Sequence, residues 1–127
     1  MKTTTLLLTV LCVASFLASC SMLNLSPCSQ EIFDRFKQTE VVEMVKVFSE
    51  VSNMGKSVTD SFWIIEPRGR DGCVVAYHEV VNSEELIPYT FFINLETETI
   101  HPDNNASSEV FSVLWIGKDL SNGLPLP

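Results

Sequence analysis

The sequence predicts a single α+β domain, in which an N-terminal amphipathic helix, or two helices, packs on a three- to four-stranded antiparallel meander. Three observations support this fold class. Apolar residues recur every three or four positions between residues 26 and 55, a spacing typical of a helix. From residue 61 the pattern changes to β-branched and aromatic runs separated by turn residues. Of the 127 residues, 108 follow residue 19, enough for one domain and not two.

The N-terminal residues have the composition of an export signal. Lys2 provides a positive start, and residues 6–17 are almost entirely apolar. A transmembrane helix needs about 20 apolar residues, so this run is too short to span a bilayer. The small residues Ala18 and Ser19 follow it and suit a signal-peptidase site. We therefore expect residues 1–19 to be a cleaved signal peptide.

The next position adds a possible membrane anchor. Leu17-Ala18-Ser19-Cys20 resembles the lipobox of bacterial lipoproteins. The resemblance implies that a diacylglyceryl group is attached to the Cys20 thiol and that residues 20–25 become a lipidated tether. Two or three acyl chains make a stable anchor, since each buried CH2 contributes about 0.8 kcal/mol. The alternative is an ordinary secretory signal cut near Ala18 or Ser19, which leaves a secreted protein.

After the tether, the sequence predicts the helical part of the domain. Ser26 and Pro27 have the residue types of an N-cap and a first helical position. Apolar residues then follow at helical spacing over residues 32–51. Residues 38–40 interrupt this stripe. The segment is therefore either one bent helix or two helices, with Thr39 as the second cap.

Three β-rich segments follow the helical region, over residues 62–66, 73–82 and 89–95. The Pro, Gly and Asp-Gly of residues 67–72 predict a hairpin loop between the first two. Residues 99–101 suit a short extension after the next turn, so the meander has three or four strands. We expect these strands to form the meander, with the helical region across one face.

The C-terminal region has a less distinct pattern. Residues 109–116 suit either a strand or a short helix, and the spacing of their apolar residues favours the helix. Gly117 is expected to end the domain, which then covers residues 26–117. Residues 118–127 contain two prolines and a glycine and are expected to form a loose tail.

The order of helix and meander resembles, in outline, the cystatin-like and PepSY-like small envelope domains. Residues 89–100 (Tyr-Thr-Phe-Phe-Ile-Asn-Leu-Glu-Thr-Glu-Thr-Ile) are similar to a recurring segment of those families, in which a Thr-Gly turn joins an aromatic strand to a second strand. Glu98 stands where those families most often have glycine. The resemblance implies a fold and assigns no functional residue.

The chain is acidic, with 16 Asp and Glu against 8 Lys and Arg and a formal net charge of −8. Such a charge repels phosphate backbones, and the sequence has no basic stripe, so we expect no nucleic-acid partner. Anionic lipid headgroups are repelled as well. A covalent anchor at Cys20 is therefore more important for attachment to a membrane.

The four cysteines divide by position. Cys12 leaves with the signal peptide, and lipidation uses Cys20. Cys28 and Cys73 then remain and can pair, which an oxidising compartment outside the inner membrane permits. The alternative is that Cys73 is buried and reduced in a strand. Neither of the two is flanked by a base at a spacing typical of a catalytic cysteine.

No motif of an enzyme active site, a cofactor or a metal centre is present in the sequence. His78 and His101 lack metal-ligand spacing, and His78 and Glu79 are strand neighbours whose side chains point to opposite faces. Residues 103–107 partly resemble a calcium loop, but an Asx-type turn explains them better. We therefore expect no catalytic residue, no metal and no cofactor.

Two groups of residues are candidates for contacts. Loop 67–72 places Arg68 and Arg70 at a hairpin tip, and loop tips often carry binding residues, although turn formation and solubility explain the same arginines. The second group is aromatic and could line a groove between helix and sheet, although such residues are mostly core: Trp63, Tyr77, Tyr89, Phe91 and Trp115.

Together these features predict a membrane-anchored bacterial lipoprotein that acts as a non-enzymatic binding module in the cell envelope and has a protein partner. Ser21 after Cys20 favours the outer membrane or cell surface over the inner membrane. The alternatives are a small exported hydrolase and a secreted, non-lipidated protein with a disulfide. A deep pocket holding His78 and a carboxylate of shifted pKa would favour the enzyme; an uncovered strand edge would favour the binding module.

Overall fold

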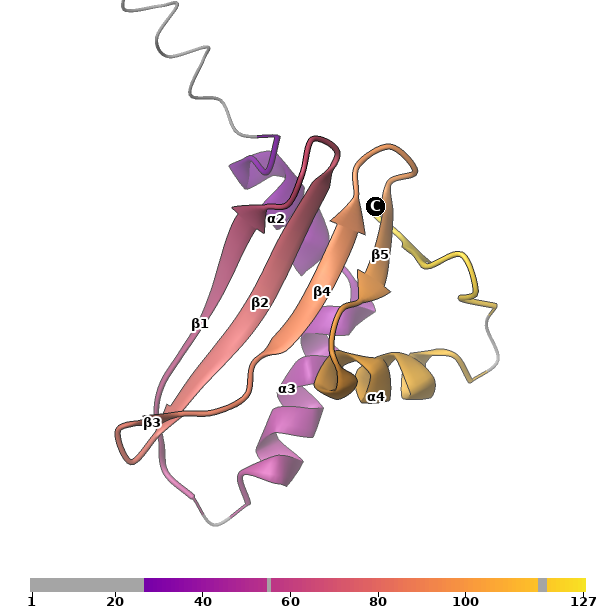
Figure 1. The fold of residues 1–127 in the computed structure, drawn as a ribbon. Helices are drawn as coiled ribbons and strands as arrows, with labels where there is room; N and C mark the ends of the chain where they lie inside the picture. The colour runs from indigo at the N-terminus through magenta and orange to yellow at the C-terminus, as the bar shows by residue number, and fades with distance from the viewer. Residues whose placement is uncertain (1–26, 55, 117–118) are drawn as a thin grey trace, which may run out of the picture.

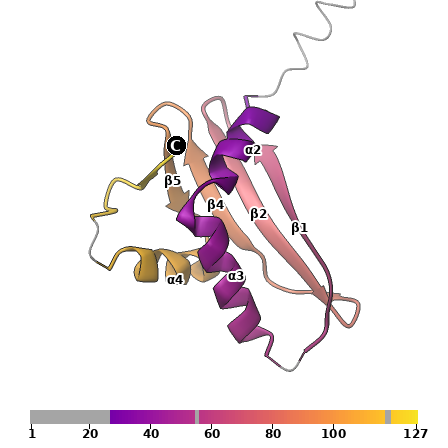
Figure 2. The same ribbon diagram turned by 180° about the vertical axis from the view of Figure 1, so that it is seen from behind.

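A computed structural model describes residues 27–54, 56–116 and 119–127. Within these residues, the chain forms helices and an antiparallel sheet, which confirms the α+β class (Figure 1). Seen from behind, α2 and α3 lie across one face of the sheet, and no helix of the described residues covers the opposite face (Figures 1 and 2). The helices are α2 (Gln30–Lys37), α3 (Glu40–Ser52) and α4 (Asn105–Leu114).

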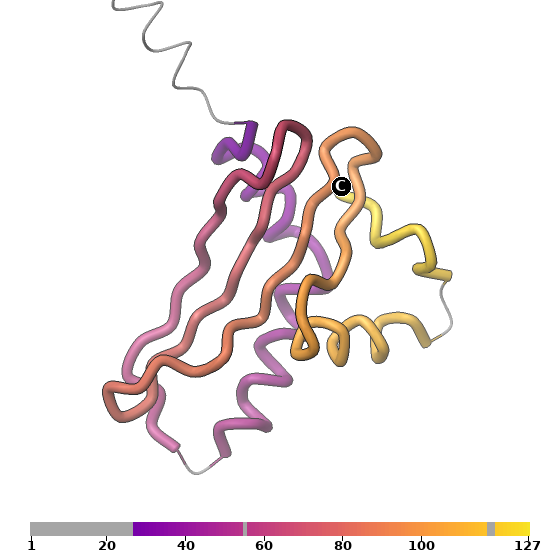
Figure 3. Tube along the Cα trace, in the orientation of Figure 1, coloured from indigo at the N-terminus to yellow at the C-terminus, as the bar shows by residue number. Residues whose placement is uncertain are grey.

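The sheet is a meander with two short additions (Figure 3). The strands lie in the order β1-β2-β4-β5-β6, and β3 pairs with β2. Each pair is antiparallel. The strands are β1 (Val58–Pro67), β2 (Gly72–Val81), β3 (Glu84–Glu85), β4 (Tyr89–Asn94), β5 (Thr99–Pro102) and β6 (Leu124–Pro125).

The core lies between the helices and the inner face of the sheet. Phe36 of α2 is fully buried, and its ring lies 5.3 Å from that of Trp63 on β1 and 5.9 Å from that of Phe91 on β4. Val41 and Val45 of α3 are also fully buried. The helical stripe is thus buried because it covers the apolar side chains of three strands.

The helical region consists of two helices, one of the two arrangements that the sequence left open. Thr39 has the extended backbone of an N-cap (φ −84°, ψ 159°) and precedes α3. The start of α2 differs from the prediction, because Ser29 and not Ser26 occupies the N-cap position (φ −75°, ψ 169°). Cys28 forms a disulfide just before this cap, which fixes where the chain can enter the helix.

That disulfide joins Cys28 to Cys73, with 5.7 Å between the Cα atoms, and is consistent with the expected oxidised pair. It connects the residue before the Ser29 cap to the start of β2. Both cysteines are buried. The predicted signal peptide (1–19), the lipidation site Cys20 and the tether (20–25) lie outside the described residues.

Helix α4 confirms the preference for a helix in this region, but it begins earlier than residue 109. The cause is a capping box: the Asn104 side chain accepts a hydrogen bond from the Ser107 amide (3.0 Å), and the Ser107 hydroxyl accepts one from the Asn104 amide (3.0 Å). The oxygen-rich run at residues 103–107 is thus a helix start.

The expectation of a loose C-terminal tail is wrong for residues 119–127. Strand β6 pairs with β5, with Leu124 opposite Ile100. Leu120 and Leu126 are buried in the core, and the Leu126 amide donates to the Glu98 carbonyl (2.8 Å). The prolines and glycine suggested disorder, but these leucines have apolar surface to bury against the sheet and α4.

Glu98 adopts a positive φ of 52°, the left-handed conformation that glycine prefers. This is the position at which the resembled families most often have glycine. The side chain lies 2.9 Å from the Arg35 guanidinium, and Arg35 also donates to the Pro127 carbonyl (2.6 Å). Glu98 therefore combines a strained backbone with an ion pair to α2.

Candidate functional site

Strand β1 forms an edge of the sheet. It pairs with β2 on one side, and no strand of the described chain pairs with its other side. Natural edge strands are usually short, charged or covered, because an open edge can pair with another chain. Here residues 61–65 (Ser-Phe-Trp-Ile-Ile) form an uncharged segment in the middle of the strand. Among the described residues, this edge is thus unpaired and its central segment is uncharged.

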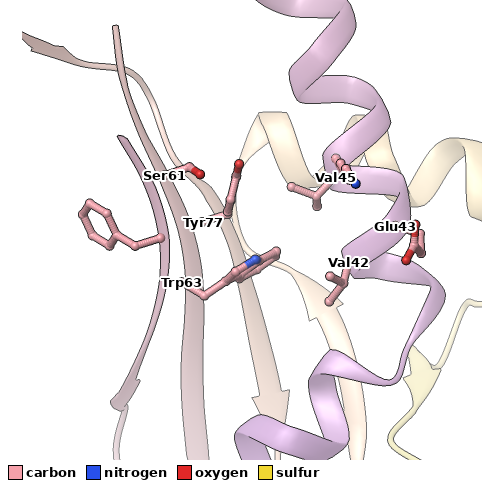
Figure 4. Close-up of a pocket in the computed structure, with 8 residues that line it drawn as sticks. Val42, Glu43, Val45, Ser61, Trp63 and Tyr77 are labelled. Atoms are coloured by element: carbon pink, nitrogen blue, oxygen red, sulfur yellow. The ribbon is translucent and has the colours of Figure 1, made fainter. Parts of the chain in front are cut away.

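A groove runs beside this edge, between α3 and the first two strands. It has a volume of about 260 Å3. Trp63 and Tyr77 point from the strands toward α3, and Val42 and Val45 point back toward them (Figure 4). The Trp63 and Tyr77 rings are 5.0 Å apart and form the floor of an apolar cleft. Two charged residues of α3 also line it: Glu43 and Lys46.

The strand edge and the groove form one surface, which we call the edge site: residues 60–66 of β1 with the groove-lining residues of α3 and β2. A chain added to β1 would have alternate side chains facing this groove, because strand residues alternate between the two faces of a sheet. Main-chain pairing and a side-chain pocket are the two elements by which proteins recognise extended peptides.

The aromatic residues singled out from the sequence separate in the structure. Trp63 and Tyr77 come together at the groove, as the sequence suggested. Phe91 is fully buried in the core, and Trp115, 47% exposed, lies at the end of α4. Tyr89 lines a different pocket. Sequence spacing could not distinguish these roles, because they depend on how α3 lies over the strands.

The outer face of the sheet carries His78. Its Nδ1 lies 2.7 Å from the Glu85 carboxylate, and its ring stacks on Phe62 with centroids 5.2 Å apart. Glu79 is buried on the opposite face, where its carboxylate accepts a hydrogen bond from the Asn53 amide (2.8 Å). His78 and Glu79 therefore do not meet, as the alternation of strand residues predicts.

Arg68 lies at the β1–β2 hairpin and binds Asp103, which precedes the cap of α4. Two hydrogen bonds of 2.6 and 3.0 Å join the guanidinium to the carboxylate. The hydrogen bonds between the two side chains lower the pKa of the Asp103 carboxyl and raise the pKa of the Arg68 guanidinium. Arg70 is exposed at the tip of the loop. A contact between Arg68 and a partner protein would therefore have to replace the Arg68–Asp103 ion pair.

A pocket of about 360 Å3 with both polar and apolar walls lies between the end of α3 and the start of α4. Glu79, Tyr89 and Glu109 line it. Burial raises the pKa of the Tyr89 hydroxyl, a hydrogen bond with Ser52 opposes this, and the two carboxylates raise it further. The raised pKa keeps the Tyr89 hydroxyl protonated near neutral pH.

The described ranges contain neither a cluster of metal-ligating side chains nor a membrane-spanning helix. Within residues 27–54, 56–116 and 119–127, no three His, Cys, Asp or Glu side chains lie close enough to hold a metal ion. None of the helices in these ranges has the length and apolar character needed to cross a bilayer.

Comparisons with known proteins give no match: no family model, no curated protein and no solved structure is significantly similar to this chain. The edge site is therefore characterised by its geometry and chemistry alone. The resemblance to cystatin-like and PepSY-like domains stays a prediction.

Proposed function

We propose that this protein is a bacterial lipoprotein that acts as a non-enzymatic interaction module in the cell envelope. Acyl chains on Cys20 hold the domain at the membrane, and the edge site binds an extended segment of a partner protein. By the lipobox resemblance, Ser21 after Cys20 favours the outer membrane or cell surface.

The observation that carries the proposal is the open edge of β1 beside an apolar groove. An open strand edge is a template for pairing with another chain, and the apolar groove beside it offers a pocket for a partner side chain. Trp63 adds a large aromatic surface at the groove, and aromatic residues are enriched among those that dominate binding energy.

Two features support the location. The disulfide between Cys28 and Cys73 belongs to an oxidising compartment, in agreement with export through the N-terminal signal. The acidic net charge of −8 gives no attraction to anionic lipids. Attachment to a membrane therefore depends on the acyl chains.

The mass of the mature protein purified from membranes tests the anchor. We expect a polypeptide that begins at Cys20, carries acyl mass and lacks two protons because Cys28 and Cys73 are joined. The Cys20→Ser variant should lack the acyl mass and leave the membrane fraction. A soluble wild-type protein without acyl mass, cut near Ala18 or Ser19, would contradict the anchor and identify a secreted protein.

Site-specific photo-crosslinking tests the interaction. Benzoylphenylalanine replaces Phe62, which is 40% exposed beside the edge, in protein kept in its native membranes. We expect one adduct of defined mass. The control position is Ile116, which is 79% exposed after α4 and should give no such adduct. Equal labelling from both positions, or none from Phe62, would contradict a binding role of the edge.

A further inference from the structure

We infer that the partner segment pairs with residues 60–66 of β1 and has a basic residue at each end and uncharged, mainly apolar residues between them. This inference rests on the proposed function and specifies the chemistry of the partner. It follows from the limits of the edge, the charges at those limits and the groove between them.

Two features limit the part of β1 that can pair. The register shifts between Val58 and Asp60, which marks a bulge at the start of the strand. At the other end Pro67 lacks a backbone N–H and cannot donate to an added strand. Regular pairing is therefore confined to residues 60–66.

The two ends of this segment are both acidic. Asp60 and Glu66 are exposed, and every residue between them is uncharged. Residues directly opposite each other on neighbouring strands lie about 5 Å apart, where opposite charges attract and like charges repel. A partner segment with one basic residue opposite Asp60 and another opposite Glu66 would form an ion pair at each end. The net charge of −8 attracts the same kind of partner at longer range.

The middle of the segment favours a different kind of partner side chain from the two ends. Trp63 faces the groove, so the partner residue opposite Trp63 faces it as well. Val42 and Val45 line the opposite wall, which favours an apolar side chain there. Glu43 and Lys46 both line the groove, so their opposite charges give no preference for a basic residue at this central position. Positive charge is thus favoured only at the two ends.

The charges of Asp60 and Glu66 argue against two other segments that could pair with β1. If β1 paired antiparallel with β1 of a second copy about Trp63, Asp60 would lie opposite Glu66 at both ends, and like charges in that position are destabilising. Residues 20–26 of the chain itself (Cys-Ser-Met-Leu-Asn-Leu-Ser) contain no charge and could not pair with either acid. The charges therefore favour a separate, basic protein.

A designed peptide tests this chemistry. The probe is fluorescently labelled Lys-Thr-Val-Leu-Val-Thr-Lys, which reads the same in both directions and so fits parallel or antiparallel addition. The matched peptide carries Glu in place of each Lys. Fluorescence anisotropy with the native protein in non-ionic detergent should show binding about tenfold tighter for the lysine peptide. Added salt should reduce this difference.

Protein variants and a modified peptide make the test specific. Asp60→Lys with Glu66→Lys should reverse the preference, so that the glutamate peptide binds more tightly. Glu96→Lys with Glu109→Lys makes the same change of charge at exposed positions outside β1 and should keep the wild-type preference. The lysine peptide with N-methyl groups on its five central residues cannot pair through its backbone and should not bind.

The outcomes separate this inference from the proposed function. Failure of the lysine peptide to bind, equal binding of the two peptides, or retained binding after N-methylation would overturn the inference. Crosslinks from Phe62 in membranes together with any of these results would leave the interaction module standing and reject the basic partner. Peptide binding as expected, with no acyl mass on Cys20, would support the inference and reject the membrane anchor.

Discussion

Arg68 and Asp103 connect two distant parts of the chain through single side chains. Arg68 follows β1, and Asp103 precedes the capping box of α4. The Arg68 guanidinium also lies over the Phe92 ring, with its central carbon 5.9 Å from the centroid. The pair therefore holds the hairpin tip against the sheet and the start of α4.

The pH dependence of stability should reveal this pair. Hydrogen bonding to Arg68 lowers the pKa of Asp103 in the folded state below its usual value near 4. Its stabilisation is therefore fully present above about pH 4 and is lost as the pH falls through the lowered pKa. We expect Asp103→Asn to lower the denaturant midpoint at pH 7, with a smaller difference from wild type as the pH falls toward 2.

The control for this measurement is Asp71→Asn, which neutralises an exposed carboxyl in the same hairpin loop. It should leave the difference between pH 7 and pH 2 close to that of the wild type. A parallel pH profile for Asp103→Asn and wild type would show that the pair contributes no pH-dependent stability.

Glu98 offers a second test at a single residue. Left-handed backbone costs a residue with a Cβ about 1–2 kcal/mol, and glycine has no such cost. Both Glu98→Ala and Glu98→Gly remove the ion pair with Arg35, so the difference between them reports the backbone alone. We expect the free energy of unfolding to be about 1 kcal/mol higher for Glu98→Gly than for Glu98→Ala. Equal stability of the two variants, measured by denaturant unfolding, would show that the turn relaxes without glycine.

Among the elements, the disulfide has the largest expected effect on stability. It closes a loop with a sequence separation of 45 residues, which contains α2, α3 and β1. In the chain-entropy model such a loop stabilises the folded state by about 3–4 kcal/mol, because it restricts the unfolded chain. We expect Cys28→Ala with Cys73→Ala to lower the free energy of unfolding by that amount.

Denaturant unfolding of the double variant and of reduced wild-type protein should give the same result if the covalent link is responsible. An unchanged free energy of unfolding in the double variant would mean that packing around the start of β2 already fixes this loop.

The sequence predicted those elements whose pattern depends on local spacing. The apolar stripe over residues 32–51 identified the helical region, and Thr39 marked its division into two helices. The Pro, Gly and Asp-Gly signals of loop 67–72 identified the β1–β2 hairpin. In each case the residues that form the element also carry its signal, so no knowledge of the three-dimensional arrangement was needed.

The errors occurred where distant contacts determine the structure. Leu120 and Leu126 are ordered because they pack against the core, and β6 exists because β5 lies beside it. The cap of α2 is Ser29 and not the predicted Ser26, and it directly follows Cys28, which is joined to the distant Cys73. The sequence analysis mentioned an uncovered strand edge only as a general type of binding surface. The sequence could not show that β1 is the edge or that α3 leaves a groove beside it.

For the whole molecule, the acidic residues on β1 should affect association as well as binding. Asp60 and Glu66 oppose pairing between two β1 edges, since each would face an acid of the other copy. We expect Asp60→Asn with Glu66→Gln to self-associate at lower protein concentrations than wild type, measured by sedimentation velocity. Glu96→Gln with Glu109→Gln removes the same charge elsewhere and should sediment like wild type. Unchanged sedimentation of the β1 variant would show that these acids do not prevent self-pairing.

The position of the disulfide also has a mechanical consequence. If tension acts between the N-terminus and the C-terminal part of the chain, the force reaches Cys28 and passes through the sulfur–sulfur bond directly to Cys73 in β2. The intervening helices and β1 then lie outside the path of the load. The surface offered by β1 would therefore keep its shape under tension for as long as the bond stays oxidised, and reduction would expose it to unravelling from α2 onward.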